Sequence, residues 1–314
     1  MSKWQYTKGL HDLGHGSFAY LQPDGGWGWS NAGLITDGEE SLLVDTLFDL
    51  HLTREMLDIM RDAAPQAENI GTLINTHANG DHTFGNQLVE GAAIIASAAG
   101  AQEMAELPPQ ALAEIMRNAD AMGEAGLFLK KLFGVFDFEG IELRAPTETF
   151  SGTTIRKVGD KKVELHEVGP AHTKGDTLVY VPEDKTVFTG DILFIEGHPI
   201  MWEGPVENWI RACDLMLNWD VETIIPGHGP ITDKAGVRAV RDYLAYIARE
   251  ARKRHTAGMG VMEAARDIAF DDYSSWGDAE RIAVNIDTLY KEFNHDTSPP
   301  DVVKLFGMMA ELAR

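Results

Sequence analysis

Four short segments of the sequence place histidine or aspartate beside glycine, a pattern that suits metal binding. Glycine allows a sharp turn and close packing of the backbone, so that the neighbouring side chain can be directed at one point. Imidazole nitrogens and carboxylate oxygens are ligands that zinc, iron and manganese accept. One such segment alone is more often a turn or a helix cap, but four together indicate a metal centre. The segments are His77-Ala78-Asn79-Gly80-Asp81-His82, Gly169-Pro170-Ala171-His172-Thr173, Thr189-Gly190-Asp191 and Pro226-Gly227-His228-Gly229.

Each segment follows a short apolar run that we expect to form a β-strand. Such runs lie at residues 71–75, 163–167, 186–189 and 223–225. In the region 52–60 the apolar residues recur instead with helical spacing. Because each half of the chain delivers these segments at strand ends, we expect two sheets packed face to face with helices outside them.

Two further stretches are helical in pattern and carry none of the four segments. One covers about residues 98–140 and the other about residues 233–314. The first ends in an apolar run with Phe133 and Phe136, which suits either a cover for the core or a lid over a substrate. We therefore expect an α/β protein formed as a single domain, residues 1–314, with a helical insertion and a helical C-terminal region.

The order and spacing of the four segments resemble the metallo-β-lactamase-fold superfamily of metallohydrolases, whose first motif reads H-x-H-x-D-H. The resemblance extends from about Asn31 to Gly229 and includes the run Leu42-Leu43-Val44-Asp45-Thr46. It implies a four-layer αββα sandwich. It also implies a first metal site with His77 and His172, a second with Asp81, His82 and His228, and Asp191 as the carboxylate that bridges them.

Asn79 departs from this motif, because it stands where the superfamily usually has its second histidine. An amide oxygen can coordinate a metal, but it is neutral and a weaker donor than imidazole. We expect the first site to bind its ion less tightly, or to leave Asn79 outside the coordination shell. The expected cofactor is zinc, as one or two ions, with iron and manganese as alternatives.

Metal-dependent hydrolysis is the function that these residues favour. A divalent ion lowers the pKa of bound water and polarises a carbonyl, so no covalent nucleophile is needed. The sequence also has no Gly-x-Ser-x-Gly segment to supply one. We expect a metal-activated water to hydrolyse a small-molecule ester, thioester or lactone, with Asp81 as the catalytic proton carrier to the leaving group.

Two alternatives follow from the missing histidine. His77, His172 and Asp191 form the two-histidine, one-carboxylate set of mononuclear iron oxygenases, and persulfide dioxygenases of the same superfamily resemble this arrangement. The chain could instead be a catalytically idle metal-binding scaffold, for which Asn79 is the only support. We favour the hydrolase because the second site is intact.

Several aromatic residues and one more histidine are candidates for substrate contacts. Trp27 and Trp29 lie in a Gly-rich turn that borders the groove in this fold, or they close a hairpin as an aromatic pair. His198 and Trp202 lie in the loop after the third segment, where they could line the pocket; the alternative for His198 is an ordinary surface histidine. The predicted substrate-binding residues are Trp27, Trp29, His198, Trp202, Phe133 and Phe136.

Composition argues against several classes of partner. The 314 residues carry a formal net charge of −22, so the surface repels nucleic acid and anionic membranes. The single cysteine, Cys213, excludes an intrachain disulfide. The N-terminus shows no apolar signal segment, so we expect a cytoplasmic protein with a small-molecule substrate; these features are also compatible with a homo-oligomer.

Overall fold

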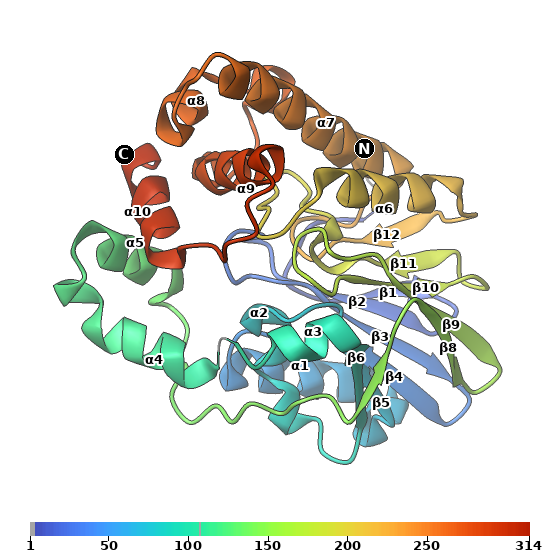
Figure 1. Cartoon of the computed structure of the whole chain (residues 1–314). Coiled ribbons are helices and arrows are strands. Elements are labelled where there is room, and N and C mark those ends of the chain that lie inside the picture. Colours follow the sequence, from blue (N-terminus) through green and yellow to red (C-terminus); the bar gives the residue numbers. More distant parts are fainter. Residues whose placement is uncertain (1–3, 107) are drawn as a thin grey trace.

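The computed structural model describes residues 4–106 and 108–314, and two β-sheets pack face to face in it with helices on both outer sides (Figure 1). This is the four-layer αββα sandwich that the sequence predicts. Residues 1–3, at the start of the predicted single domain, and residue 107, within the predicted insertion, lie outside the described residues.

Within the described residues, the first sheet has the strand order β1-β2-β3-β4-β5-β6-β7 and the second has the order β12-β11-β10-β9-β8. Strands β4 to β7 run parallel to one another, and so do β11 and β12. Parallel neighbours end at the same edge of a sheet, which brings together the loops that follow them. The strands are β1 (Gly9–Gly14), β2 (Ser17–Leu21), β3 (Ala32–Asp37), β4 (Glu40–Val44), β5 (Thr72–Ile74), β6 (Ala93–Ser97), β7 (Glu148–Phe150), β8 (Thr153–Val158), β9 (Lys161–Glu167), β10 (Thr177–Val181), β11 (Thr186–Phe188) and β12 (Thr223–Ile225).

Successive residues of the central strands enter two different apolar cores. In β10, Val179 and Val181 belong to the core between the two sheets, whereas Leu178 and Tyr180 belong to the core beneath the helices. A strand buried on both faces reads as a continuous apolar run, because its side chains point alternately to the two sides. This explains why the apolar runs in the sequence lack a polar alternation.

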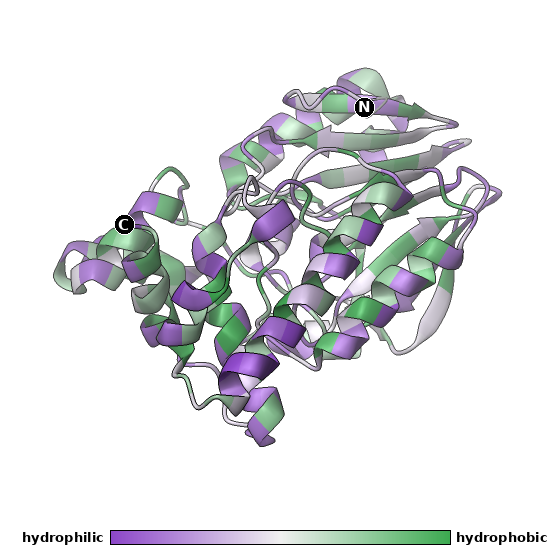
Figure 2. Ribbon diagram, turned by 90° about the horizontal axis from the view of Figure 1, so that it is seen from above, coloured by the Kyte–Doolittle hydropathy of each residue, from purple (hydrophilic) through white to green (hydrophobic). Residues whose placement is uncertain are grey.

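Amphipathic helices cover the two outer faces, and Figure 2 shows hydrophobic and hydrophilic residues alternating along them. α1 buries Met56 and Met60 in the core beside the first sheet, while α6 and α7 cover the second sheet. Among the described residues, no helix has both the length and the apolar character that a membrane crossing requires. The helices are α1 (Leu50–Ala63), α2 (Gly80–Thr83), α3 (Ala98–Glu103), α4 (Pro109–Asn118), α5 (Gly123–Phe133), α6 (Val206–Asn218), α7 (Lys234–Thr256), α8 (Val261–Asp267), α9 (Ile282–Asn294) and α10 (Val302–Leu312).

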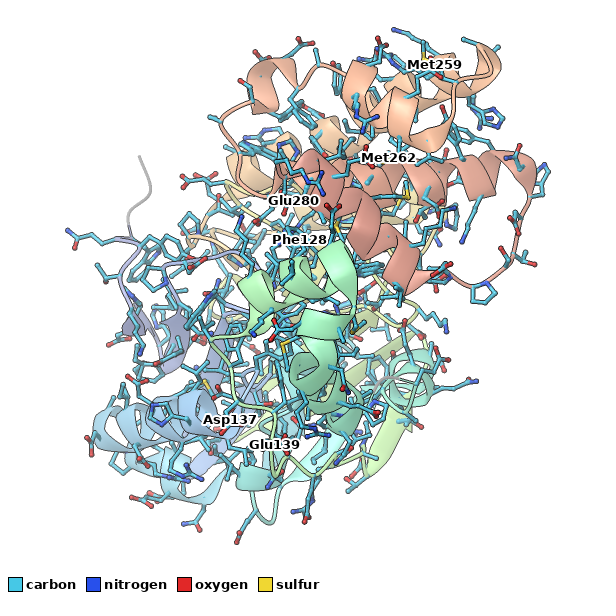
Figure 3. The ribbon with its side chains drawn as sticks, turned by 90° about the vertical axis from the view of Figure 1, so that its left-hand side faces the viewer. Phe128, Asp137, Glu139, Met259, Met262 and Glu280 are labelled. Atoms are coloured by element: carbon cyan, nitrogen blue, oxygen red, sulfur yellow. The ribbon has the colours of Figure 1, made fainter. Side chains whose placement is uncertain are left out.

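The predicted helical insertion and helical C-terminal region are both present. α3, α4 and α5 form the insertion, and α7 to α10 form the C-terminal region. α5 packs against α10 at one end of the sandwich, where Phe128 marks α5 in Figure 3. Two segments that are far apart in the sequence therefore form one helical pair beside the sheets.

Candidate metal centre

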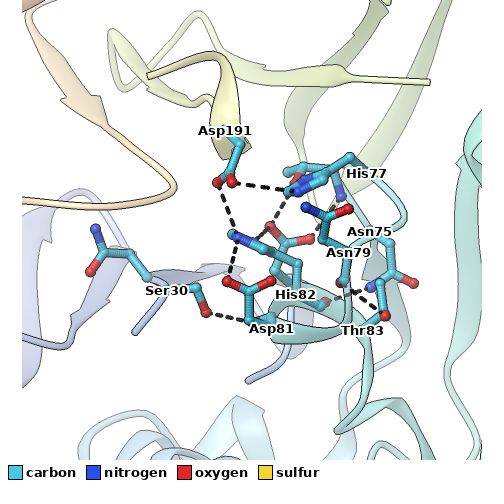
Figure 4. Close-up of polar contacts among 12 residues, drawn as sticks. Ser30, Asn75, His77, Asn79, Asp81, His82, Thr83 and Asp191 are labelled. Atoms are coloured by element: carbon cyan, nitrogen blue, oxygen red, sulfur yellow. Dashed lines mark hydrogen bonds and ion pairs between the residues drawn. The ribbon is translucent and has the colours of Figure 1, made fainter. Parts of the chain in front are cut away.

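Loops that follow strands of both sheets bring six ligand-type side chains to one place, and Figure 4 labels four of them, His77, Asp81, His82 and Asp191. β5 leads to His77, and the short helix α2 that follows holds Asp81 and His82. Asp191 follows β11, and His228 follows its parallel neighbour β12. The loop between β9 and β10 supplies the last member, so that the six-residue cluster consists of His77, Asp81, His82, His172, Asp191 and His228.

One half of the cluster is spaced to hold a single ion. His82 Nε2 lies 3.1 Å from Asp191 Oδ1 and 3.9 Å from Asp81 Oδ2. His228 Nε2 lies 3.3 Å from Asp81 Oδ2 and 3.4 Å from Asp191 Oδ2. Ligands at about 2.0–2.1 Å from a tetrahedral zinc ion are separated by about 3.3 Å, close to these distances.

Asp45, directly after β4, orients two of the histidines. Its Oδ2 accepts the Nδ1–H of His82 at 2.9 Å and the hydroxyl hydrogen of Thr76 at 2.7 Å. Because the Thr76 hydroxyl donates to Asp45, its oxygen accepts the Nδ1–H of His77 at 3.0 Å. Hydrogen bonds of this kind fix the tautomer and the ring orientation of a metal ligand. We did not assign Asp45 a role from the sequence; the signal available was an acid directly after a buried strand.

Backbone carbonyls orient the other two histidines. His172 Nδ1 donates to the Ile200 carbonyl at 2.7 Å, and His228 Nδ1 donates to the Trp29 carbonyl at 3.2 Å. With the hydrogen on Nδ1, the Nε2 of His172 carries a lone pair. Asn79 Nδ2 donates to this lone pair at 3.0 Å. The structure thus brings Asn79 to the cluster as a hydrogen-bond donor.

Glycine is required where the loop of His228 meets Asp191. A Cβ on Gly227 would collide with the Asp191 carboxylate, and Gly190 has a φ of +49°, in the left-handed region. Only glycine allows this close approach of two backbones without strain. The crowding predicted for these glycines is therefore present at this point.

Burial and mutual charge set the protonation states in the cluster. Burial lowers the pKa of both His77 and His172, which keeps these imidazoles neutral. Burial would raise the pKa of Asp191, but His228 and His82 outweigh it and hold that pKa well below its usual range. Burial would likewise lower the pKa of His228, but Asp191 and other contacts raise it to about 9. An ion that binds His228 must displace this proton.

The residues present fit a divalent metal ion. His77 Nε2, His82 Nε2 and Asp191 Oδ1 are buried and have no hydrogen-bond partner among the described residues. A buried polar atom without a partner is costly, and lone pairs directed at one region are what a cation requires. Among the described residues, two groups of three ligand atoms lie within 4.8 Å of one another: His77 with His82 and Asp191, and Asp81 with His82 and His228.

A group of aromatic side chains that pack on one another includes most of the predicted substrate-binding residues. The ring of Trp29 contacts Phe136 at 4.9 Å, and the ring of Trp27 contacts Phe133 at 6.0 Å. Phe306 of α10, which we did not single out from the sequence, lies 5.7 Å from Trp27 and 6.2 Å from Phe133. Further ring contacts complete the aromatic group, which consists of Trp27, Trp29, Phe48, Phe133, Phe136, Trp202 and Phe306.

Two backbone hydrogen bonds tie the aromatic group to the cluster. The Trp29 carbonyl accepts from His228, as described above, and the Trp202 N–H donates to the His172 carbonyl at 3.1 Å. Trp27 and Trp29 contact different phenylalanines of the insertion, so each has its own partner rather than closing a hairpin as one pair. Two of the predicted aromatic residues are therefore bonded through their backbones to His228 and His172, whereas the rings that contact these imidazoles are those of Phe194 and Trp209.

His198 has a different environment from the one predicted. Its side chain is fully buried, and Nδ1 lies 3.0 Å from the hydroxyl of Tyr243. Its ring packs against Phe270 and Trp276. This position is neither that of a surface histidine nor that of a residue in the six-residue cluster, because the loop turns inward toward α7. His198 therefore packs in an aromatic environment.

A family model matches the part of the chain that carries this geometry. The model of the metallo-beta-lactamase superfamily matches residues 25–228, and the chain belongs to this superfamily. The range contains the entire six-residue cluster, and the resemblance predicted from the sequence is confirmed. Membership supports metal binding and hydrolysis as the general class of activity.

Named relatives are distant. The chain is 21% identical to the Beta-lactamase-like protein 2 homolog of Caenorhabditis elegans over 71% of this chain and 63% of that protein. It is 24% identical to the Probable metallo-hydrolase MJ0888 of Methanocaldococcus jannaschii over 67% of this chain and 92% of that protein. The chain thus spans less than two thirds of the length of the first of these relatives.

Solved structures share the fold at low sequence identity. The stereoselective inverting sec-alkylsulfatase Pisa1 from Pseudomonas sp. has a TM-score of 0.66 at 16% identity, covering 94% of this chain and 52% of that chain. A metallo-beta-lactamase from Pontibacter korlensis has a TM-score of 0.56 at 18% identity, covering 75% of this chain and 98% of that chain. At these identities the likeness establishes the fold alone.

Proposed function

We propose that the protein is a metal-dependent hydrolase of a small-molecule ester, thioester or lactone with an apolar acyl or ring group. The observation that carries this proposal is the convergence of four imidazoles and two carboxylates, among which His77 Nε2, His82 Nε2 and Asp191 Oδ1 are buried without a hydrogen-bond partner among the described residues. We propose zinc as the resident ion, with iron and manganese as alternatives. When bound, the ion would activate water and polarise the carbonyl under attack.

The side chains of the cluster supply the acid–base chemistry. His228 and His82 lower the pKa of Asp81, although burial alone would raise it, so this residue is a carboxylate at neutral pH. Asp81 is also the most exposed of the six, with 9% of its surface accessible, which leaves it in reach of a substrate. We assign Asp81 to carry a proton to the leaving group, a role worth roughly a hundredfold or more in rate.

The aromatic group supports an apolar substrate. It adjoins the cluster through the backbones of Trp29 and Trp202, and its rings come partly from α5 and α10. Trp27 and Trp202 are only half-buried, so part of the group is exposed to solvent. An acyl chain or ring that displaced solvent from these side chains would gain about 25 cal/mol for each Å² of apolar surface buried.

Charge supports a small molecule rather than a nucleic acid. The net charge of −22 opposes a phosphate backbone, and Asp81 and Asp191 add two buried carboxylates at the centre itself. The intact group of Asp81, His82 and His228 also favours hydrolysis over the iron dioxygenase, which needs only His77, His172 and Asp191.

The test is a substrate panel with controlled metal content. Protein stripped with a chelator and reloaded with Zn²⁺, Mn²⁺ or Fe²⁺ is assayed on acetyl and octanoyl esters, acyl thioesters and lactones. We expect turnover that is lost on stripping and returns on reloading, and that is largely absent from Asp81→Ala. Alkyl sulfates are included because a sec-alkylsulfatase shares the fold.

Each contrary outcome points to one alternative. Oxygen consumption with a persulfide, supported by Fe²⁺ alone, would establish the dioxygenase. Turnover of alkyl sulfates but of no carboxylic ester would replace the proposed substrate class. A bound ion with no turnover across the panel would favour the idle scaffold.

A further inference from the structure

The arrangement of ligand atoms bears on how many ions the centre holds. Both groups of three ligand atoms include His82, whose Nδ1 is already used in the hydrogen bond to Asp45. Only Nε2 is left, and an imidazole nitrogen has one lone pair, so His82 can bind only one ion at a time. An ion bound through His82 therefore leaves His77, His172 and Asp191 as the set for any second ion, with His172 Nε2 and His77 Nε2 at 3.3 and 3.7 Å from Asp191 Oδ2.

The number of ligands, rather than their spacing, favours the half that contains Asp81 and His228. In that half Asp81, His82 and His228 form one group, and the two carboxylate oxygens of Asp191 lie 3.1 Å from His82 and 3.4 Å from His228. Two imidazoles and the Asp81 carboxylate, with Asp191 beside them, supply the number of ligands that a tetrahedral ion needs, whereas the other half has two imidazoles and Asp191 only.

In the other half, both ring nitrogens of His172 already take part in hydrogen bonds. His172 Nε2 belongs to neither group of three and accepts a hydrogen bond from the Asn79 amide at 3.0 Å. Its Nδ1 is held by the Ile200 carbonyl at 2.7 Å, so the ring cannot offer its other nitrogen without losing that bond. An ion that used His172 would have to break the hydrogen bond from Asn79. The only ligand that the Asn79 side chain could then offer is a neutral amide oxygen, which is a weak donor.

We infer that the centre holds one tightly bound ion, between Asp81, His82, Asp191 and His228, and that Asn79 prevents tight binding of a second by hydrogen bonding to His172. Asn79 thus converts half of a potential two-ion centre into a hydrogen-bonding position. Ion stoichiometry does not depend on which substrate is hydrolysed, or on whether any is.

The experiment measures Zn²⁺ binding to the whole protein. Elemental analysis after dialysis gives the tight stoichiometry, and calorimetric titration with Zn²⁺ alone gives the affinities. We expect one equivalent in the unmodified protein and two in Asn79→His, with the second ion bound at least about tenfold more tightly than in the unmodified protein.

Two more variants separate the parts of the inference. Asn79→Ala frees the lone pair of His172 without adding a ligand, so it should bind a second ion more tightly than the unmodified protein but less tightly than Asn79→His. His172→Ala should keep its one ion, whereas His228→Ala should lose it. Melting temperatures of all variants show whether each is folded.

Two results would overturn the inference. Two equivalents of similar affinity in the unmodified protein would show that Asn79 does not limit binding. A His172→Ala variant without tight metal, but still folded, would place the ion in the other half. Because these readouts need no turnover, a failure of the proposed hydrolysis would be seen separately, in the substrate panel.

Discussion

The six-residue cluster and the aromatic group adjoin each other but are held in place by different means. Each imidazole of the cluster has its Nδ1 fixed by a carboxylate, a hydroxyl or a backbone carbonyl. The aromatic rings contact one another instead, and one polar anchor is the bond from Trp27 Nε1 to Glu280 at 3.1 Å. Directional bonds specify position, whereas ring contacts allow more than one packing.

The two regions also differ in where the chain supplies them. The cluster comes wholly from residues 25–228, the range of the family model, whereas Phe306 of the aromatic group lies beyond it in α10. The part shared with the superfamily therefore carries the chemistry. In the substrate site that we propose, the part outside that range supplies Phe306, and there we expect this protein to differ from its relatives.

The largest effect should come from the cluster itself. Asp81→Ala removes a ligand and the proposed proton carrier, so we expect turnover of the best substrate to fall at least about a hundredfold. Far-ultraviolet circular dichroism and the melting temperature should show a folded variant. If the folded variant retained its ion and the original rate, Asp81 would have neither assigned role.

A smaller effect is expected one contact away, at Asp45. Asp45→Asn replaces an acceptor by an amide that cannot accept from Thr76 and His82 equally well. We expect zinc affinity to fall about 10- to 100-fold, the usual range for a partner of a metal ligand. Calorimetric titration with Zn²⁺ measures this loss.

Thr76→Val provides the matched control for Asp45. It removes the hydroxyl that links Asp45 to His77 but leaves the bond between Asp45 and His82 in place. If the tight ion lies with His82, this variant should lose less affinity than Asp45→Asn. An equal loss in both would show that His77 is as important for the ion as His82.

The same difference explains what the sequence could predict. His77, Asp81 and His82 are close in the sequence, and the remaining ligands follow apolar strands, so spacing and residue type were enough to find them. Five members of the aromatic group were also named from the sequence, but Phe48 and Phe306 have no such local signal. Phe306 lies in a C-terminal helix, and only its packing against α5 places it near Trp27.

The strands that were predicted and those that were missed differ in how their residues are buried. Central strands buried on both faces gave clear apolar runs, whereas β1 and β7 are edge strands with polar or glycine residues and gave none. α6 does carry helical spacing in Trp209, Cys213 and Met216, so that helix was open to prediction and was missed. His198 shows the limit of loop reasoning, because a loop near a ligand can also turn inward.

In the aromatic group we expect a moderate effect that depends on the substrate. Phe306→Ala should raise KM for an octanoyl substrate about tenfold, equivalent to about 1.4 kcal/mol, and should barely change KM for the acetyl analogue. The truncations Phe133→Ala and Phe136→Ala should show the same dependence on chain length. Octanoate binding, followed by tryptophan fluorescence, allows the same comparison without turnover.

Met309→Ala is the matched control for Phe306. Met309 is fully buried on the same helix and is not one of the rings of the aromatic group, so its loss destabilises α10 without removing a ring. Both variants should melt at lower temperature than the unmodified protein. A KM effect that is equal for short and long chains, or equal in both variants, would assign the group to the core alone.

The smallest effect concerns stability at the junction between α3 and the loop that carries His172. Glu103 of α3 accepts the N–H of Lys174 at 3.0 Å, and burial raises the pKa of Glu103 from 4.5 to about 7. A carboxyl whose pKa is higher in the folded protein contributes stability that is fully present below pH 4.5, its unfolded value, and is lost as the pH rises toward 7.

Glu103→Gln keeps an acceptor for Lys174 without a charge, so at pH 8 it should melt about 2 °C above the unmodified protein, and this difference should shrink as the pH falls toward 4.5. Melting curves of both proteins across this range provide the measurement, with Glu114→Gln, an exposed change on α4, as the control. A difference that stays constant with pH would show that the ionisation of Glu103 does not affect stability at this junction.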